Sequence, residues 1–170
     1  MLDTSIVKLL NDQINKEFYS AYLYLDMADF YAAKGLLGYE NWFKVQAQEE
    51  MAHAMLFRQY LLNNGHPVEL NALANPTKTY KDNKAPLEEA LKHEQFVTAS
   101  INSIYEEAMT RKDYRTLQFL DWFVKEQGEE EMNAEDNINK YNLFGSDAKA
   151  LYMLDQELKA RVFNPPSLVI

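Results

Sequence analysis

Residues 43–60 read FKVQAQEEMAHAMLFRQY, and this stretch decides the fold. One set of its residues recurs at alternating steps of three and four positions, the pattern of a helix that buries one face in a bundle. The set begins at Phe43 and resumes with Phe57, but Gln46, Glu50 and His53 interrupt it between them. This pattern predicts a helix bundle with a polar layer in its core.

Three more segments carry the same apolar stripe, and each is interrupted near its middle by a polar residue. The interruptions are Glu17 in residues 4–34, Glu94 in residues 86–112, and Gln127 and Glu130 in residues 114–142. Four such stripes predict four helices around one axis, with the interrupting side chains pointing at that axis.

The links between the stripes predict the topology. Gly35 ends the first helix, and Gly65 and Pro67 end the second, at the start of a long connection. Short links join antiparallel neighbours, whereas a link of this length can cross the bundle end to end. The sequence therefore predicts one all-α domain over residues 1–170, a four-helix bundle with one long crossover and a short fifth C-terminal helix. The expected bounds are 4–34, 38–64, 86–112, 114–142 and 147–162, with the crossover at about 65–85.

Composition excludes several classes of protein. The net charge is −9, from 26 acidic and 17 basic residues, which disfavours nucleic acid as a partner and favours cations. There is no cysteine, so disulfides and cysteine-ligated iron are excluded. The N-terminal residues lack the pattern of a signal peptide and no apolar run reaches membrane-spanning length. We expect no membrane association and a cytoplasmic location.

The polar interruptions require a compensating charge. A buried carboxylate carries a desolvation cost of several kcal/mol, which is on the order of the whole net free energy of unfolding of a small domain. Several converging carboxylates also repel one another, and no Lys or Arg lies on the stripes to neutralise them. A bound cation would supply this charge directly, so the pattern predicts a metal site.

Spacing supports the same reading. Residues three apart share a helix face, so Glu50 and His53 can reach one ion, and Gln127 and Glu130 repeat that spacing. Glu17 and Glu94 are separated by as many positions as Glu50 and Gln127, as in two similar helix pairs. Taken alone, the Glu50-x-x-His53 pair or an acidic run such as residues 129–131 is more often a solvated surface. His93, beside Glu94 but off the stripe, is expected to be exposed or to support the site from behind.

With these motifs in place, the chain resembles the bacterial non-haem ferritins over nearly its whole length. The segments that carry the resemblance are NKEFYSAYLY (15–24), AQEEMAHA (47–54), KHEQ (92–95) and EQGEEE (126–131). Carboxylate bundles of this kind take one Glu from each of two helices and Glu-x-x-His pairs from the others.

The resemblance implies a particular set of ligands for iron. The first ion would be held by Glu17, Glu50 and His53, and the second would share Glu50 as a bridge. Glu94 and Glu130 would complete the second ion, and Gln127 would lie beside the pair of ions. Tyr24 would be a hydrogen-bonding and redox neighbour of the centre. A third iron site would be formed by Glu49, Glu126, Glu129 and Glu130.

The function that this resemblance implies is a ferroxidase. Fe²⁺ would be oxidised to Fe³⁺ by O₂ or H₂O₂ at the di-iron centre and stored as a ferric oxide mineral inside a hollow homo-oligomeric cage of twenty-four subunits. Carboxylate and imidazole ligands suit this metal. An apolar row on the fifth helix, Leu151, Leu154 and Leu158, is expected to bury against other copies.

Departures from related families limit the alternatives. Bacterioferritins, which bind haem, carry a second Glu-x-x-His where this chain has Gln127-x-x-Glu130, so haem is not expected, although Met51 occupies the place of their haem-ligating methionine. Animal ferritins line their three-fold channels with two acids, and the corresponding positions here are Leu117 and Leu120. The open alternatives are a haem-binding bacterioferritin, a non-storage di-iron or dimanganese peroxidase, and a purely structural bundle that binds protein partners.

Overall fold

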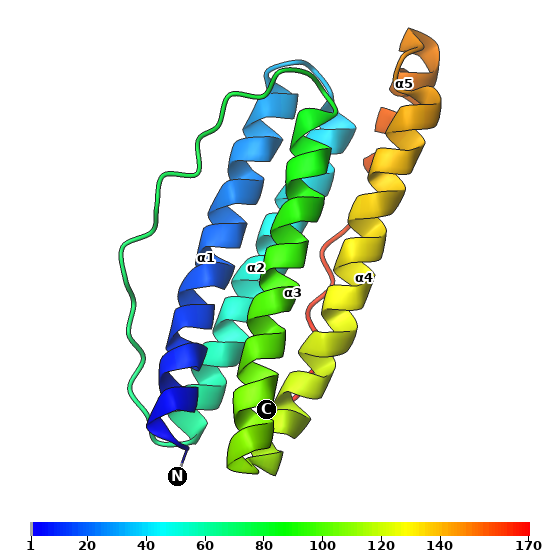
Figure 1. Cartoon of the computed structure of the whole chain (residues 1–170). Helices are drawn as coiled ribbons and strands as arrows, with labels where there is room; N and C mark the ends of the chain where they lie inside the picture. Colours follow the sequence, from blue (N-terminus) through cyan, green and yellow to red (C-terminus); the bar gives the residue numbers. More distant parts are fainter. Residues whose placement is uncertain (1) are drawn as a thin grey trace.

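The structure, a computed structural model, describes residues 2–170 (Figure 1). Among these residues there are five helices and no strand, which confirms the predicted fold class. The helices are α1 (Thr4–Ala32), α2 (Leu37–Asn63), α3 (Ala85–Arg111), α4 (Tyr114–Phe144) and α5 (Ala148–Leu158). The fourth helix runs two residues further than the sequence predicts, to Phe144.

Local chemistry sets most helix ends. Asp3, Asp113 and Asp147 each accept a hydrogen bond from a first-turn backbone amide, at 2.9, 3.2 and 2.8 Å. The links between α1 and α2 and between α3 and α4 are short because left-handed residues reverse the chain at once, Gly35 at φ 74° and Lys112 at φ 56°. Each link therefore joins antiparallel neighbours.

Two apolar clusters fill the bundle, one toward each end. The first holds Ile14, Phe57, Val97 and Phe123 among its members. The second holds Tyr24, Phe43, Leu87 and Ala90 among its members. The polar interruptions predicted from the stripes lie between these clusters on every helix of the bundle and are buried. They form a layer across the middle of the bundle.

The crossover from α2 to α3 runs the length of the bundle on its outside (Figure 1). Two asparagines of α1 hold its backbone. Asn11 accepts from the amide of Glu69 at 2.7 Å, and Asn15 accepts from the amide of Asn71 at 2.8 Å and donates to the Glu69 carbonyl at 2.9 Å. The crossover is therefore positioned although most of its side chains are exposed.

The fifth helix differs from expectation in two ways. It ends at Leu158 rather than 162, because the Asn41 side chain of α2 donates to the backbone carbonyls of Leu158 and Arg161, at 3.3 and 2.9 Å, and draws the chain away. The prediction that its apolar row faces other copies is wrong. Leu154 and Leu158 are buried within the same chain and Leu151 packs against the same cluster, whereas Tyr152 is exposed.

A buried carboxylate docks α5 on the bundle. Asp155 accepts hydrogen bonds from the backbone amides of Gly38 and Tyr39, at 2.7 and 3.1 Å, in the first turn of α2. The N-cap of α2, Leu36, supplies no side-chain cap of its own. A Cβ at Gly38 would lie 1.6 Å from the Asp155 carbonyl oxygen, so only glycine allows this approach. Asp155 therefore caps α2 from another helix.

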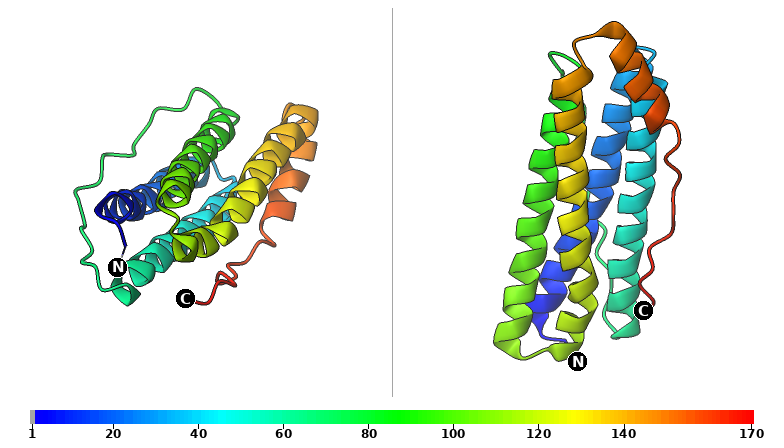
Figure 2. Two further views of the ribbon diagram at one scale, coloured as in Figure 1. Left: turned by 60° about the horizontal axis from the view of Figure 1, so that its bottom comes forward. Right: turned by 90° about the vertical axis from the view of Figure 1, so that its right-hand side faces the viewer.

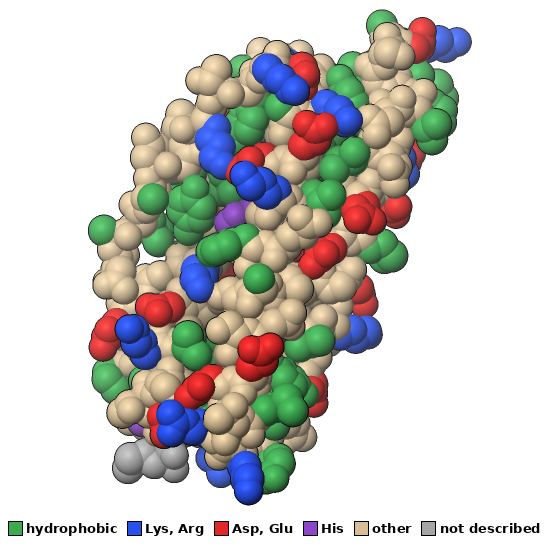
Figure 3. Space-filling model, viewed as in Figure 1, with side chains coloured by type: hydrophobic (Ala, Val, Ile, Leu, Met, Phe, Trp, Pro, Cys, Tyr) green, Lys and Arg blue, Asp and Glu red, His purple; other side chains and the backbone are tan. Residues whose placement is uncertain are grey.

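After α5 the chain turns back along the bundle beside α2, toward the end where α2 finishes and α4 begins (Figure 2). Trp122 donates through Nε1 to the Ser167 hydroxyl at 3.2 Å, and Leu168 packs against the first apolar cluster. Basic and acidic side chains are interspersed over the face shown in Figure 3. Across residues 2–170, none of the helices combines the length and the apolar character needed to cross a membrane.

Candidate metal centre

The polar layer brings together the three residues predicted for the first ion. Glu17 of α1 and Glu50 and His53 of α2 each offer a ligand atom, and these atoms lie within 4.8 Å of one another. His53 Nδ1 is 3.7 Å from a Glu50 oxygen. All three side chains are buried, and no Lys or Arg is among the buried residues of the described chain. Anionic and imidazole ligand atoms gathered in this way suit a bound cation.

Two glutamines that the predicted site does not include hold the carboxylates in place. Gln13 donates to Glu17 at 2.7 Å, and Gln46 donates to Glu130 at 2.6 Å and to Glu50 at 3.2 Å. Both are fully buried. Gln46 interrupts the second stripe and could have been assigned, whereas Gln13 lies beside the first stripe, one turn before Glu17, and gives only that spacing as a signal. One Glu17 oxygen has no hydrogen-bond partner and stays open to a ligand.

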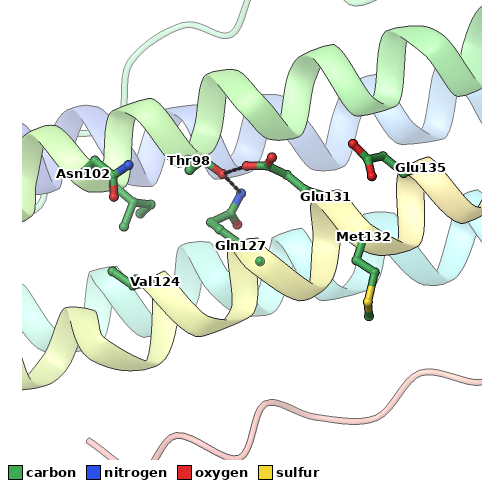
Figure 4. Close-up of a pocket in the computed structure, with 9 residues that line it drawn as sticks. Thr98, Asn102, Val124, Gln127, Glu131, Met132 and Glu135 are labelled. Atoms are coloured by element: carbon green, nitrogen blue, oxygen red, sulfur yellow. Dashed lines mark hydrogen bonds between the residues drawn. The ribbon is translucent and has the colours of Figure 1, made fainter.

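Glu94 is held from two sides. The Tyr24 hydroxyl, predicted to lie beside the centre, donates to one of its oxygens. The Gln127 amide donates to the other at 3.2 Å. Gln127 also lines a groove of about 370 Å³ between α3 and α4 (Figure 4). Thr98 lies in this groove and donates to Glu131 at 2.5 Å. The Gln127 amide therefore lies between Glu94 and the acidic side chain of this groove.

Two of the acids predicted for the second and third ions lie together on the other side of His53. His53, Glu126 and Glu130 have ligand atoms within 4.8 Å of one another, with His53 Nε2 4.0 Å from Glu126. His53 thus faces Glu50 with one nitrogen and Glu126 with the other. Glu94 lies in neither of the two groups of clustered ligand atoms found in residues 2–170.

The other two acids predicted for the third site have cationic partners instead. Glu49 pairs with Arg161, which follows α5. Glu129 is more than half exposed, with Lys125 at 3.6 Å. Only Glu126 and Glu130 of the predicted third site therefore lie together with a further ligand. The assignment of all these side chains as iron ligands stays a prediction.

Burial perturbs the acids of the polar layer strongly. Loss of solvent raises the pKa of Glu17, Glu50 and Glu130 well above the ordinary range, and neighbouring carboxylates raise it further. Burial also raises the pKa of Glu94, against hydrogen bonds from Tyr24 and Gln127 that lower it. A divalent ion would reverse this electrostatic strain by favouring the charged forms.

His93 is buried, which corrects the expectation that it could be exposed. Its Nε2 lies 2.7 Å from the Ser20 hydroxyl, and that hydroxyl donates to the Lys16 carbonyl at 3.0 Å. Since Ser20 has a single proton, His93 must donate through Nε2. Burial, with a smaller contribution from Lys78, lowers the pKa of His93 to about 4. The ring supports α1 beside Tyr24 and does not reach the ligand groups.

The fold and this buried acidic layer define a carboxylate helix bundle, and comparison with known proteins agrees. Residues 7–144 match the ferritin-like domain family, so the chain belongs to that family. It is 40% identical over 159 residues to the bacterial non-heme ferritin of Campylobacter jejuni, covering 94% of this chain and 95% of the relative. It is 38% identical over 158 residues to a probable bacterial non-heme ferritin-like protein of Haemophilus influenzae, covering 93% and 96%.

Solved structures extend the likeness to three dimensions. An open-pore ferritin from the hyperthermophilic archaeon Archaeoglobus fulgidus superposes with a TM-score of 0.92 at 43% identity, over 95% of this chain and 98% of that one. These comparisons confirm the resemblance to bacterial non-haem ferritins read from the motifs.

Proposed function

We propose that the protein is an iron-storage ferritin that oxidises Fe²⁺ to Fe³⁺ at the buried acidic layer. The observation that carries this proposal is the group formed by Glu17, Glu50 and His53, buried and without a basic partner. Iron is the substrate in this reaction. Carboxylate and imidazole bind Fe²⁺, and the anionic ligands favour the Fe³⁺ product by stabilising its higher charge.

The chemistry follows from the ligand set. Each of two Fe²⁺ ions gives up one electron, and O₂ accepts both with two protons to form H₂O₂; H₂O₂ itself can accept two electrons and two protons to form two waters. Glu50 belongs to the first group and shares the Gln46 amide with Glu130 of α4, which suits the proposed bridging role. Gln46 and Gln13 keep the oxygens of Glu130 and Glu17 oriented before an ion arrives, so less reorganisation accompanies binding.

The test adds Fe²⁺ aerobically to apoprotein and follows ferric absorbance. A Glu50→Ala, His53→Ala variant should lose most of the initial rate. The matched control is Glu40→Ala with His66→Ala, because Glu40 pairs with Lys44 at 3.0 Å in the first turns of α2, outside the polar layer, and His66 lies in the crossover. Oxidation by the first variant at the parent rate would show that the assigned centre is wrong.

Storage requires a hollow particle, and we propose a homo-oligomer of twenty-four subunits in the cytoplasm. Membership of the ferritin-like family supports this assembly. So does an exposed apolar surface on α1 and α2, where Leu25, Met51 and Met55 line a depression of about 510 Å³ together with Phe163. The two leucines that correspond to the acids of animal channels carry no charge to attract iron, and Leu120 is fully buried in its own chain.

Particle mass and iron retention separate storage from the rival reading. A storage ferritin should elute as a large particle and keep ferric iron after desalting. A monomer or dimer that consumes H₂O₂ and keeps no iron would instead establish the peroxidase alternative. Haem is not part of the proposal, and an absorbance spectrum of the purified protein tests that directly.

A further inference from the structure

The end of the chain places a fixed positive charge against the candidate metal centre. Arg161 follows α5, and its backbone is tied to α2 because its carbonyl accepts from Asn41 at 2.9 Å. Its guanidinium donates to the Trp42 carbonyl at 3.1 Å and lies 4.4 Å from the centre of the Trp42 ring. The other terminal guanidinium nitrogen donates to Glu49. Backbone, ring and carboxylate contacts together hold this side chain in one place.

Glu49 lies where it could serve an ion instead. It precedes His53 by one helical turn on the same face of α2. His53, Glu126 and Glu130 form a group of ligand atoms that Glu49 does not join, because its carboxylate is turned to Arg161. Both members of this ion pair are mostly buried, with side chains 21% and 19% exposed. Partial burial strengthens a charge-assisted pair relative to one in water.

We propose that Arg161 is an internal competitor for iron at Glu49. This inference rests on the proposed function. Arg161 acts as a positioning residue, because it sets where the Glu49 carboxylate lies. While the guanidinium holds Glu49, the group of His53, Glu126 and Glu130 binds a cation weakly. When an ion draws the Glu49 carboxylate over, Arg161 is released and the chain after α5 loses one of its attachments. Occupation of this site and attachment of residues 159–170 are therefore linked, each opposing the other.

The first test measures binding of Zn²⁺, which is not oxidised, to apoprotein by calorimetry. Arg161→Gln should bind its weakest ion at least about tenfold tighter than the parent, because a competing charge-assisted bond is removed. The matched control is Lys159→Gln, which removes the same charge from the same segment; Lys159 contacts Gln156 and lies 4.0 Å from Asp155, without reaching Glu49. Adding Glu49→Gln to the Arg161 variant should abolish the gain. Equal Zn²⁺ affinities in the Arg161 and Lys159 variants would overturn the proposal.

The second test uses the unmodified chain, so it does not depend on how a variant folds. The Arg161 amide donates to the Leu158 carbonyl at 3.3 Å, and its hydrogen exchange reports attachment of the segment. Saturating Zn²⁺ should speed exchange in residues 159–163 while slowing it in α2. Unchanged or slower exchange after α5 would contradict the competition. Neither readout depends on iron oxidation, so loss of the ferroxidase proposal and loss of this one are separately visible.

Discussion

Glu17, a proposed iron ligand, has a buried carboxylate oxygen without a hydrogen-bond partner, and this arrangement opposes folding of the apoprotein. It is buried, and its other oxygen is held by Gln13. Burial and the neighbouring Glu50 raise its pKa well above the ordinary range. A folded-state pKa above the unfolded value means that the native state holds the proton more tightly. Stability of the apoprotein therefore falls as pH rises from the unfolded value toward that raised pKa.

Replacing this carboxylate with its neutral isostere should stabilise the apoprotein. We expect Glu17→Gln to raise the free energy of unfolding at pH 7 by at least about 1 kcal/mol, because the new amide oxygen keeps the contact from Gln13 without the buried charge. The same variant should lose much of the stabilisation that Zn²⁺ gives the parent. Thermal unfolding with and without Zn²⁺ measures both, with Glu40→Gln as the control outside the polar layer. A less stable apoprotein would mean that the charge is compensated internally.

His93 should also make stability depend on pH, in the opposite direction. Its pKa falls to about 4 in the folded chain, so the unfolded state binds the proton first. The stability contributed by the neutral ring is present above the unfolded value of about 6.5 and is lost as pH falls toward 4. Between pH 7 and pH 5 the parent should lose about 2 kcal/mol that His93→Gln does not lose. Urea unfolding at the two pH values measures the difference, and His66→Gln should behave as the parent.

Between helices, the most informative contact is the cap that α5 provides for α2. Helix propensity and spacing predict where α2 begins to within a residue, yet they give no hint that its cap comes from Asp155, far along the chain. Sequence patterns report which residues share a face of one helix. They do not report which distant side chain will reach a free amide, because that depends on how the helices pack.

Removing this cap should loosen α5. Asp155→Ala leaves two buried amides, of Gly38 and Tyr39, without an acceptor, and we expect a loss of about 1–2 kcal/mol. Asp155→Asn keeps an acceptor oxygen and should retain most of the stability. Thermal unfolding and hydrogen exchange across α5 provide the measurement. Gly38→Ala offers an independent route to the same state, since its Cβ would meet the Asp155 carbonyl; undisturbed exchange in α5 of both variants would refute the docking role.

For the molecule as a whole, the interrupted stripes predict the bundle and the acids of the central layer, because periodicity locates a buried face and a charge on that face stands out. The lengths of the links predict the topology. The same reasoning misses Gln13, which lies beside a stripe, and Arg161, which lies in a segment with no periodicity. It also misplaces Leu154 and Leu158 on an outer surface. An apolar row indicates burial, but the sequence does not say whether the covering partner is the same chain or another copy.

The exposed apolar surface on α1 and α2 gives a prediction at the level of assembly. Adding a carboxylate there should weaken self-association, since burying an unpaired charge at an interface is unfavourable. We expect Leu25→Glu with Met55→Glu to shift the particle to a smaller mass by light scattering, while Val169→Glu, on a residue that is 92% exposed, leaves the mass unchanged. An unaltered large particle would place the contacts between copies elsewhere.

The asparagines that hold the crossover influence which positions of the chain can change in sequence during evolution. Asn11 and Asn15 contact the backbone of the segment around Glu69 and Asn71, and not its side chains. Any sequence that presents the same amides and carbonyl satisfies them. The side chains at positions 69 and 71 can therefore vary without loss of these hydrogen bonds. The sequence is restricted on α1 instead, because the amide side chains of Asn11 and Asn15 fix the path of the crossover backbone.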